Sequence, residues 1–206
     1  MKDVNYKNFR LPPSLLASLI TYIVFFLLPA NTFASTTQTK AELSFQSCSA
    51  VANELLTVIQ LYQNHFALEE LLKSLPEITP KGQTRVRDLY TKLENEGVVS
   101  VYSKVNSAYS QCAKQAYKKN GIPAADTMEN GYYFCAGENK VRYEIVLAIY
   151  LNAPEEKVIP QLQEQHQNIG RHYYQLARQS GIESVFNELA SSHKSCTNQL
   201  YIATPH

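Results

Sequence analysis

Apolar residues recur every three or four positions along most of this chain, a spacing that predicts amphipathic helices. The clearest runs are Cys48–Tyr62, Val86–Leu93 and Val98–Cys112. Gly97, Gly121 and Gly181 follow or interrupt such runs, and each suits the left-handed residue that ends a helix. Asn64 and Asn152 can cap the short helices expected after them. The pattern therefore predicts an all-α protein.

The second half of the chain repeats the first. Matching residues lie 84 positions apart near the end of each half and 87 apart near its start, and the difference falls in the loop at 78–83. The matches include Tyr90 and Tyr174, Gly97 and Gly181, Tyr102 and Phe186, Glu69 and Glu156, and the cysteines. Such a period predicts two tandem repeats, each of four helical pieces, packed as a helical bundle.

The four cysteines are expected to form one disulfide in each repeat. When four helical pieces run up and down, the start of the first and the end of the fourth lie at the same end of the unit. Three pieces would separate them beyond the roughly 7 Å between Cα atoms that a disulfide allows. Of the three possible pairings, the repeat favours Cys48 with Cys112 and Cys135 with Cys196.

The first 34 residues have the three parts of a secretory signal peptide. Lys2, Lys7 and Arg10 make its first part basic. The apolar run Leu15–Leu28 is shorter than the roughly 20 residues of a spanning helix, and Thr32–Ala34 supplies a cleavage site. We expect cleavage there and export to the periplasm or the medium; an uncleaved membrane anchor is the alternative.

This reading divides the rest of the chain into three parts. Residues 35–119 are predicted to be the first helical repeat, 120–131 a linker and 132–206 the second helical repeat. Beside the linker, the segment Gly131–Phe134 is expected to leave aromatic surface exposed, because tyrosine is favoured at recognition surfaces.

Charge does not favour nucleic acid as a partner. The chain has 19 Lys and Arg against 18 Asp and Glu, and the predicted signal peptide holds several of the cations. Bulk binding to nucleic acid needs a clear basic excess. Any electrostatic partner is therefore expected at a local patch.

No motif of catalysis or metal binding is present in the sequence. The histidines lack the His-Glu-x-x-His spacing of a zinc site, and His166 and His172 would not share a helix face. Nucleophile elbows and phosphate loops are also missing. We predict no catalytic residue, no metal site and no cofactor, with a hydrolase of unrecognised site as an alternative.

A basic stretch ends the last helix of the first repeat and consists of Lys114, Tyr117, Lys118 and Lys119. Cations at this place complement the helix dipole, which is the simpler interpretation. They also make a patch of the kind that binds anionic lipid head groups. Arg85 and Lys92, on one flank of an earlier helix, could add to the patch.

A second candidate lies in the other repeat, where Arg171 and Arg178 flank Tyr174. Two guanidinium groups beside a tyrosine could hold a phosphate or a carboxylate. The alternative is that each arginine packs on its tyrosine and pairs with a carboxylate of its own repeat.

In its signal peptide, size, helicity and composition, the chain resembles small exported helical proteins that Gram-negative intracellular bacteria release through type II secretion, some of them linked to virulence. The resemblance implies a secreted binding protein and carries over no residues. We therefore expect a non-catalytic protein that binds an anionic lipid head group or a host protein through Tyr, Lys and Arg. A periplasmic inhibitor or chaperone-like protein is the first alternative.

Overall fold

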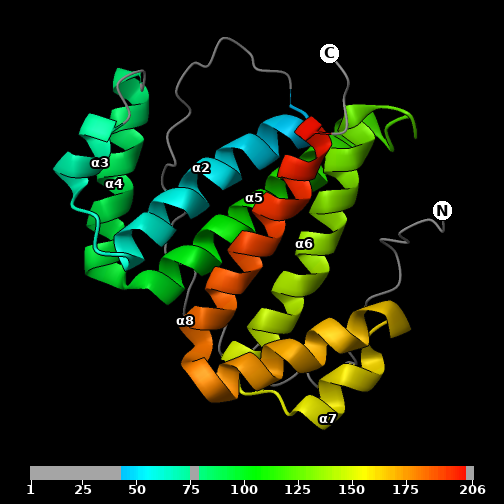
Figure 1. Cartoon of the computed structure of the whole chain (residues 1–206). Helices are drawn as coiled ribbons and strands as arrows, with labels where there is room; N and C mark the ends of the chain where they lie inside the picture. Colours follow the sequence, from blue (N-terminus) through cyan, green and yellow to red (C-terminus); the bar gives the residue numbers. More distant parts are fainter. Residues whose placement is uncertain (1–42, 75–78, 203–206) are drawn as a thin grey trace, which may run out of the picture. The chain divides into compact units, whose positions relative to one another are not determined.

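The computed structural model describes residues 43–74 and 79–202, which belong to one compact unit. The predicted signal peptide lies outside the described residues. Within these two stretches the secondary structure is helical, without a strand, so the all-α prediction is confirmed (Figure 1). The elements in chain order are α2 (Phe45–Gln63), α3 (Leu68–Ser74), α4 (Pro80–Glu96), α5 (Val98–Asn120), α6 (Met128–Tyr150), α7 (Glu155–Val158), η2 (Ile159–Gln161) and α8 (Glu164–Ile202).

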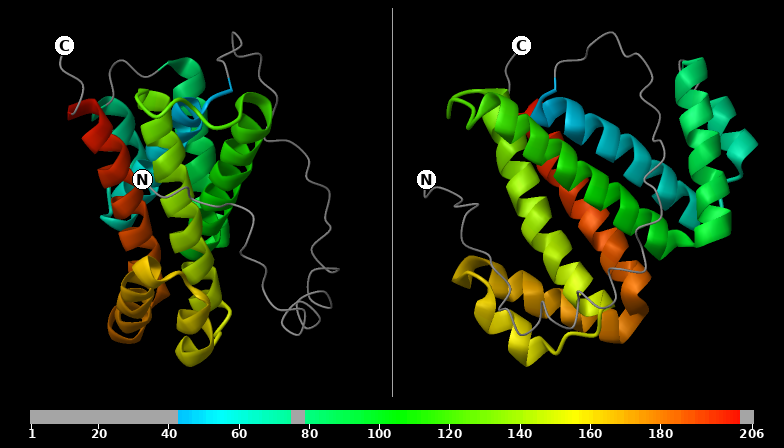
Figure 2. Two further views of the ribbon diagram at one scale, coloured as in Figure 1. Left: turned by 90° about the vertical axis from the view of Figure 1, so that its right-hand side faces the viewer. Right: turned by 180° about the vertical axis from the view of Figure 1, so that it is seen from behind.

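Four long elements pack side by side as a helical bundle: α2, α5, α6 and the later part of α8 (Figures 1 and 2). Helix α4 packs against α2 and the start of α5, and α3 packs against α4. In the second half, α7 and η2 contact α6 and α8. The bundle of long helices is therefore flanked by α3 and α4 from the first half of the chain and by α7 and η2 from the second.

Local chemistry explains where several helices begin. Ser44 caps α2, because its hydroxyl accepts from the Ser47 amide while the Ser47 side chain accepts from the Ser44 amide. The carboxylate of Glu129 also accepts from the first two amides of α2, Phe45 and Gln46. Thr127 caps α6. As a result, α6 begins within the segment 120–131 that the sequence analysis assigned to a linker.

Corresponding positions of the two halves share unusual backbone geometry. Gly97 and Gly181 both have φ of 79°, and His65 and Asn152, 87 residues apart, have φ of 62° and 57°. Gly181 is non-helical and marks a kink at which two helical segments of α8 meet, as α4 and α5 meet at Gly97. A repeat predicts such matches, and superposition of the halves stays a prediction.

Both predicted disulfides are present. Cys48 is bonded to Cys112 and Cys135 to Cys196, each with 5.8 Å between the Cα atoms. The first joins α2 to α5, and the second joins α6 to α8. Each bridge therefore fastens a pair of neighbouring long helices within one half of the chain.

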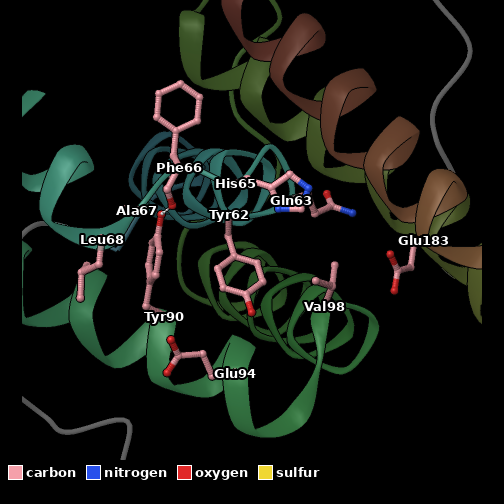
Figure 3. Close-up of a pocket in the computed structure, with 10 residues that line it drawn as sticks. All are labelled: Tyr62, Gln63, His65, Phe66, Ala67, Leu68, Tyr90, Glu94, Val98 and Glu183. Atoms are coloured by element: carbon pink, nitrogen blue, oxygen red, sulfur yellow. Dashed lines mark hydrogen bonds between the residues drawn. The ribbon is translucent and has the colours of Figure 1, made fainter.

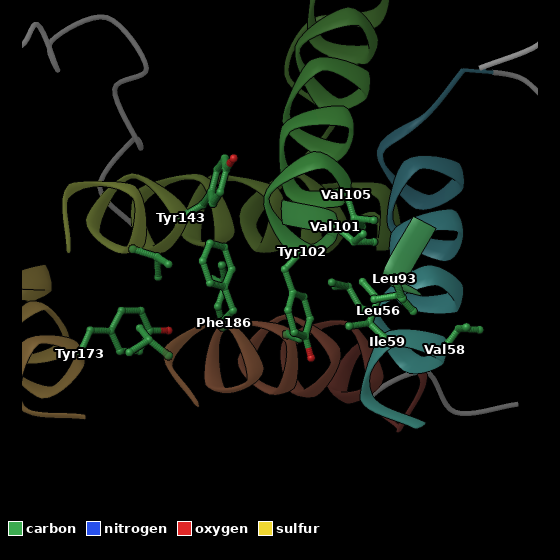
Figure 4. Packing of buried hydrophobic residues seen from close by; sticks show 14 of the residues in the cluster. Leu56, Val58, Ile59, Leu93, Val101, Tyr102, Val105, Tyr143, Tyr173 and Phe186 are labelled. Carbon is green, nitrogen blue, oxygen red and sulfur yellow. The ribbon is translucent and has the colours of Figure 1, made fainter. Parts of the chain in front are cut away.

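The hydrophobic core fills the centre of the bundle (Figure 4). Tyr102 of α5 stacks on Phe186 of α8, with ring centroids 5.7 Å apart, and both are fully buried. A smaller cluster lies around the Cys48 bridge, where Phe45 packs edge-on against Tyr133 at 5.1 Å. This packing corrects the expectation for the segment 131–134, because Tyr132 and Tyr133 are buried and Phe134 alone of its aromatic residues is exposed.

Candidate functional site

The predicted basic stretch forms an exposed surface, here called the lysine end of α5, made of Lys114, Tyr117, Lys118 and Lys119. Ala113 and Ala116 are buried and lie on the opposite face of the helix, which packs into the bundle. Within the part of the chain that the structure describes, no carboxylate forms an ion pair with any of the three lysines. Their charges therefore face solvent.

The lysine end is held in place by three contacts. The Tyr117 ring stacks on Tyr133, with centroids 6.3 Å apart. The Asn120 amide donates to the Leu43 carbonyl oxygen at 2.8 Å, and the Cys112 bridge ties the preceding turn to α2. Ile122, 61% exposed, follows directly and adds apolar surface beside the charges. The arrangement combines fixed cations with an aromatic ring and an aliphatic side chain.

Arg85 and Lys92 do not join this surface. The Arg85 guanidinium donates to both carboxylate oxygens of Glu54 on α2, at 2.9 Å each. Lys92 is half-buried and has an interaction of its own. Helix α4, which carries both residues, lies away from the lysine end (Figure 1). A helix pattern reveals that cations share a flank, but the tertiary partner decides whether they are available.

Arg171, Arg178 and Tyr174 each make contacts within the second half of the chain. Arg171 donates to side chains of its own helix, at positions 167 and 168. Arg178 pairs with Glu155 at 2.6 Å, and the buried Tyr174 hydroxyl donates to the Ala153 carbonyl oxygen. Burial, with Glu155 nearby, raises the pKa of Tyr174 to about 12. The pair of Arg178 with Glu155 agrees with the alternative interpretation, whereas Arg171 contacts amide side chains and not a carboxylate in these hydrogen bonds.

The structure also contains a hollow that the sequence analysis did not identify, here called the Tyr62 hollow (Figure 3). It has a volume of about 660 Å³, is open to solvent, and lies where α2 ends beside α4 and the start of α5. Its lining residues include Tyr62, Phe66, Tyr90, Glu94, Val98 and Glu183.

Tyr62 and Tyr90 form the aromatic wall of the hollow. Their rings meet edge-on with centroids 5.4 Å apart, and the Tyr90 hydroxyl donates to the Phe66 carbonyl oxygen at 2.8 Å. Burial, with smaller effects of Tyr62 and Glu70, raises the pKa of Tyr90. The turn after α2, which leads from Tyr62 to Phe66, contains His65 with a φ of 62°. The wall is therefore preformed.

A buried histidine lies elsewhere, between the halves of the bundle. His193 is 2% exposed, and its ring lies 4.6 Å from that of Tyr109. Neither ring nitrogen has a hydrogen-bond partner among the described residues. Burial lowers the pKa of His193 from 6.5 to about 4. The neutral imidazole is therefore the form that the folded protein prefers.

This histidine predicts acid sensitivity. The pKa of His193 is lower in the folded protein than in the unfolded chain, so the unfolded state binds the proton first as the pH falls. The free energy of unfolding therefore keeps its full value above pH 6.5 and decreases as the pH falls toward 4. At pH 5 the loss amounts to roughly 2 kcal/mol. Unfolding by denaturant at pH 7.5 and pH 5 measures it. His193→Gln is expected to remove this pH dependence, whereas His172→Gln, at an exposed position of the same helix, is expected to keep it. Equal pH dependence in both variants contradicts the assignment.

The described residues contain no group of three or more His, Cys, Asp or Glu side chains placed to hold a metal ion. None of the helices in the same stretches is long and apolar enough to cross a membrane. No family model, curated protein or solved structure matches the chain. The resemblance to exported bacterial proteins stays a prediction, and the functional argument rests on the surfaces described above.

Proposed function

We propose that this chain is a non-catalytic exported binding protein whose lysine end attaches to an anionic lipid surface. The observation that carries the proposal is a fixed helix end with three exposed lysines that lack acidic partners among the described residues. Each lysine near an anionic membrane surface contributes about 1 kcal/mol. Tyr117 and Ile122 supply side chains suited to the interface between head groups and acyl chains.

The disulfides support the exported location. Cys48–Cys112 and Cys135–Cys196 use all the cysteines of the chain, and such bonds persist in the periplasm or outside the cell. In the proposal, the predicted signal peptide directs the chain to such a compartment, where membrane surfaces present anionic head groups.

A protein partner, as for a periplasmic inhibitor or a chaperone-like protein, is the second candidate. It is favoured by apolar side chains exposed at the end of α6, where Tyr150 is 49% exposed and Leu151 58%. Apolar side chains of this size form the centres of protein interfaces. The lipid surface remains the first proposal, because the lysine end brings charge and apolar side chains together.

Removing the three lysine charges is expected to weaken lipid binding strongly. The variant Lys114→Ala/Lys118→Ala/Lys119→Ala is expected to lose about 3 kcal/mol of binding free energy, which corresponds to a hundredfold or more in affinity. Flotation with vesicles of phosphatidylcholine, with and without phosphatidylglycerol, measures it at low and physiological salt. Wild type is expected to float only with anionic vesicles, and less at higher salt.

The matched control is Lys73→Ala/Lys104→Ala/Lys157→Ala, which removes the same charge from exposed positions of α3, α5 and α7 that lie outside the lysine end. It is expected to float like wild type. Equal flotation of the two triple variants, or none by wild type, removes the lipid proposal and leaves the protein partner. Helix stability is expected to fall by only a few tenths of a kcal/mol per lysine in either variant.

A further inference from the structure

The Tyr62 hollow brings aromatic rings and unpaired carboxylates together. Figure 3 shows the Tyr62 ring in the middle of the lining residues, with Glu94 of α4 and Glu183 of α8 on different sides of it. Both glutamates are exposed, and in the described stretches neither has an ion pair with a lysine or arginine. Aromatic faces and carboxylates both attract organic cations.

The second half of the chain has a cation at the corresponding place. The residue 84 positions after Glu94 is Arg178, which pairs with Glu155 at 2.6 Å. Both residues come four positions after a tyrosine, Tyr90 or Tyr174, and are therefore neighbours of it on the helix surface. The tyrosines make the same hydrogen bond, each donating to a carbonyl oxygen at 2.8 Å. In the second half, therefore, the guanidinium of Arg178 lies beside the tyrosine. In the first half, the carboxylate of Glu94 takes that place.

We propose that the Tyr62 hollow binds an alkylammonium group, either of a free polyamine or of a lysine side chain in a protein partner. Its volume of about 660 Å³ lies within the range of small-molecule sites. The site is independent of the lipid proposal. Val98, which lines the hollow, begins α5, and the lysine end is at the other end of that 23-residue helix.

Titration with butylammonium, followed by amide chemical shifts in NMR spectra, tests the site. The amides of Phe66, Ala67 and Val98 are expected to shift, and butanol at the same concentration is expected to leave them in place. The variant Glu94→Gln/Glu183→Gln is expected to bind about tenfold more weakly, because two ion pairs are lost.

The charge-matched control is Glu156→Gln/Glu164→Gln, at exposed positions of α7 and α8. It is expected to change the affinity by less than about twofold, since charges beyond the Debye length are screened. Equal weakening by both variants overturns the proposal, as do equal shifts with butanol or the absence of shifts with butylammonium.

Two further titrations separate the sources of the ammonium group. Spermidine represents free polyamines, and N-acetyl-lysine methylamide represents a lysine side chain. Tighter binding of spermidine at the same three amides assigns the hollow to polyamines, and tighter binding of the lysine derivative assigns it to a protein partner. Binding of either supports an alkylammonium site, and binding of neither overturns it.

Discussion

Removing the Cys48–Cys112 bridge is expected to lower the free energy of unfolding by about 4 kcal/mol. The bond closes a loop of 64 residues and thereby restricts the unfolded chain. It also holds the start of α2, where Cys48 is 4% exposed and packs in the same cluster as Phe45. Cys48→Ala/Cys112→Ala therefore weakens both a constraint on the unfolded state and a contact of the folded one.

Guanidinium chloride unfolding of wild type and variant, without reductant, measures the loss. The matched comparison is Cys135→Ala/Cys196→Ala, whose loop of 61 residues predicts a similar loss, about 4 kcal/mol. Peptide mapping without reduction is expected to recover both pairs. A loss below about 1 kcal/mol for either variant, or a peptide joining Cys112 to Cys135, contradicts the assignment.

The sequence predicted the bridges and the helices because both depend on local spacing. Periodicity of three and four residues identifies a buried helix face, and Gly97 sits where the positive φ was expected. Gly181 has the same φ and is likewise the non-helical residue at which two helical segments of α8 meet.

Side-chain partners were harder to predict, because they come from distant parts of the chain. Glu54, the partner of Arg85, lies 31 residues earlier, on α2. Tyr133 is buried by Phe45 from the other half of the chain. The Tyr62 hollow needs residues from five helices and the turn after α2, so no local pattern marks it. The one available signal was Glu94, which departs from its repeat counterpart Arg178 by a reversal of charge.

Replacing Phe186 by alanine is expected to lower the free energy of unfolding by about 4 kcal/mol, the cost of a buried aromatic side chain and the cavity it leaves. Phe186 is fully buried and stacks on Tyr102, the residue 84 positions earlier. The contact therefore joins corresponding positions of the two halves. Tyr150→Ala, which removes an exposed aromatic ring, is the control and is expected to cost within about 0.5 kcal/mol.

Whether Phe186→Ala destabilises both halves of the chain or only the second tests whether the two halves fold together. Hydrogen exchange of Phe186→Ala is expected to accelerate equally in α2 and in α6, since one cooperative unit loses stability throughout. Faster exchange confined to α6 and α8 would mean that the first half is stable without the second. The contacts favour a single unit, because α2 packs on both α6 and α8 and because the stacked rings of Tyr102 and Phe186 lie in the core that both halves build.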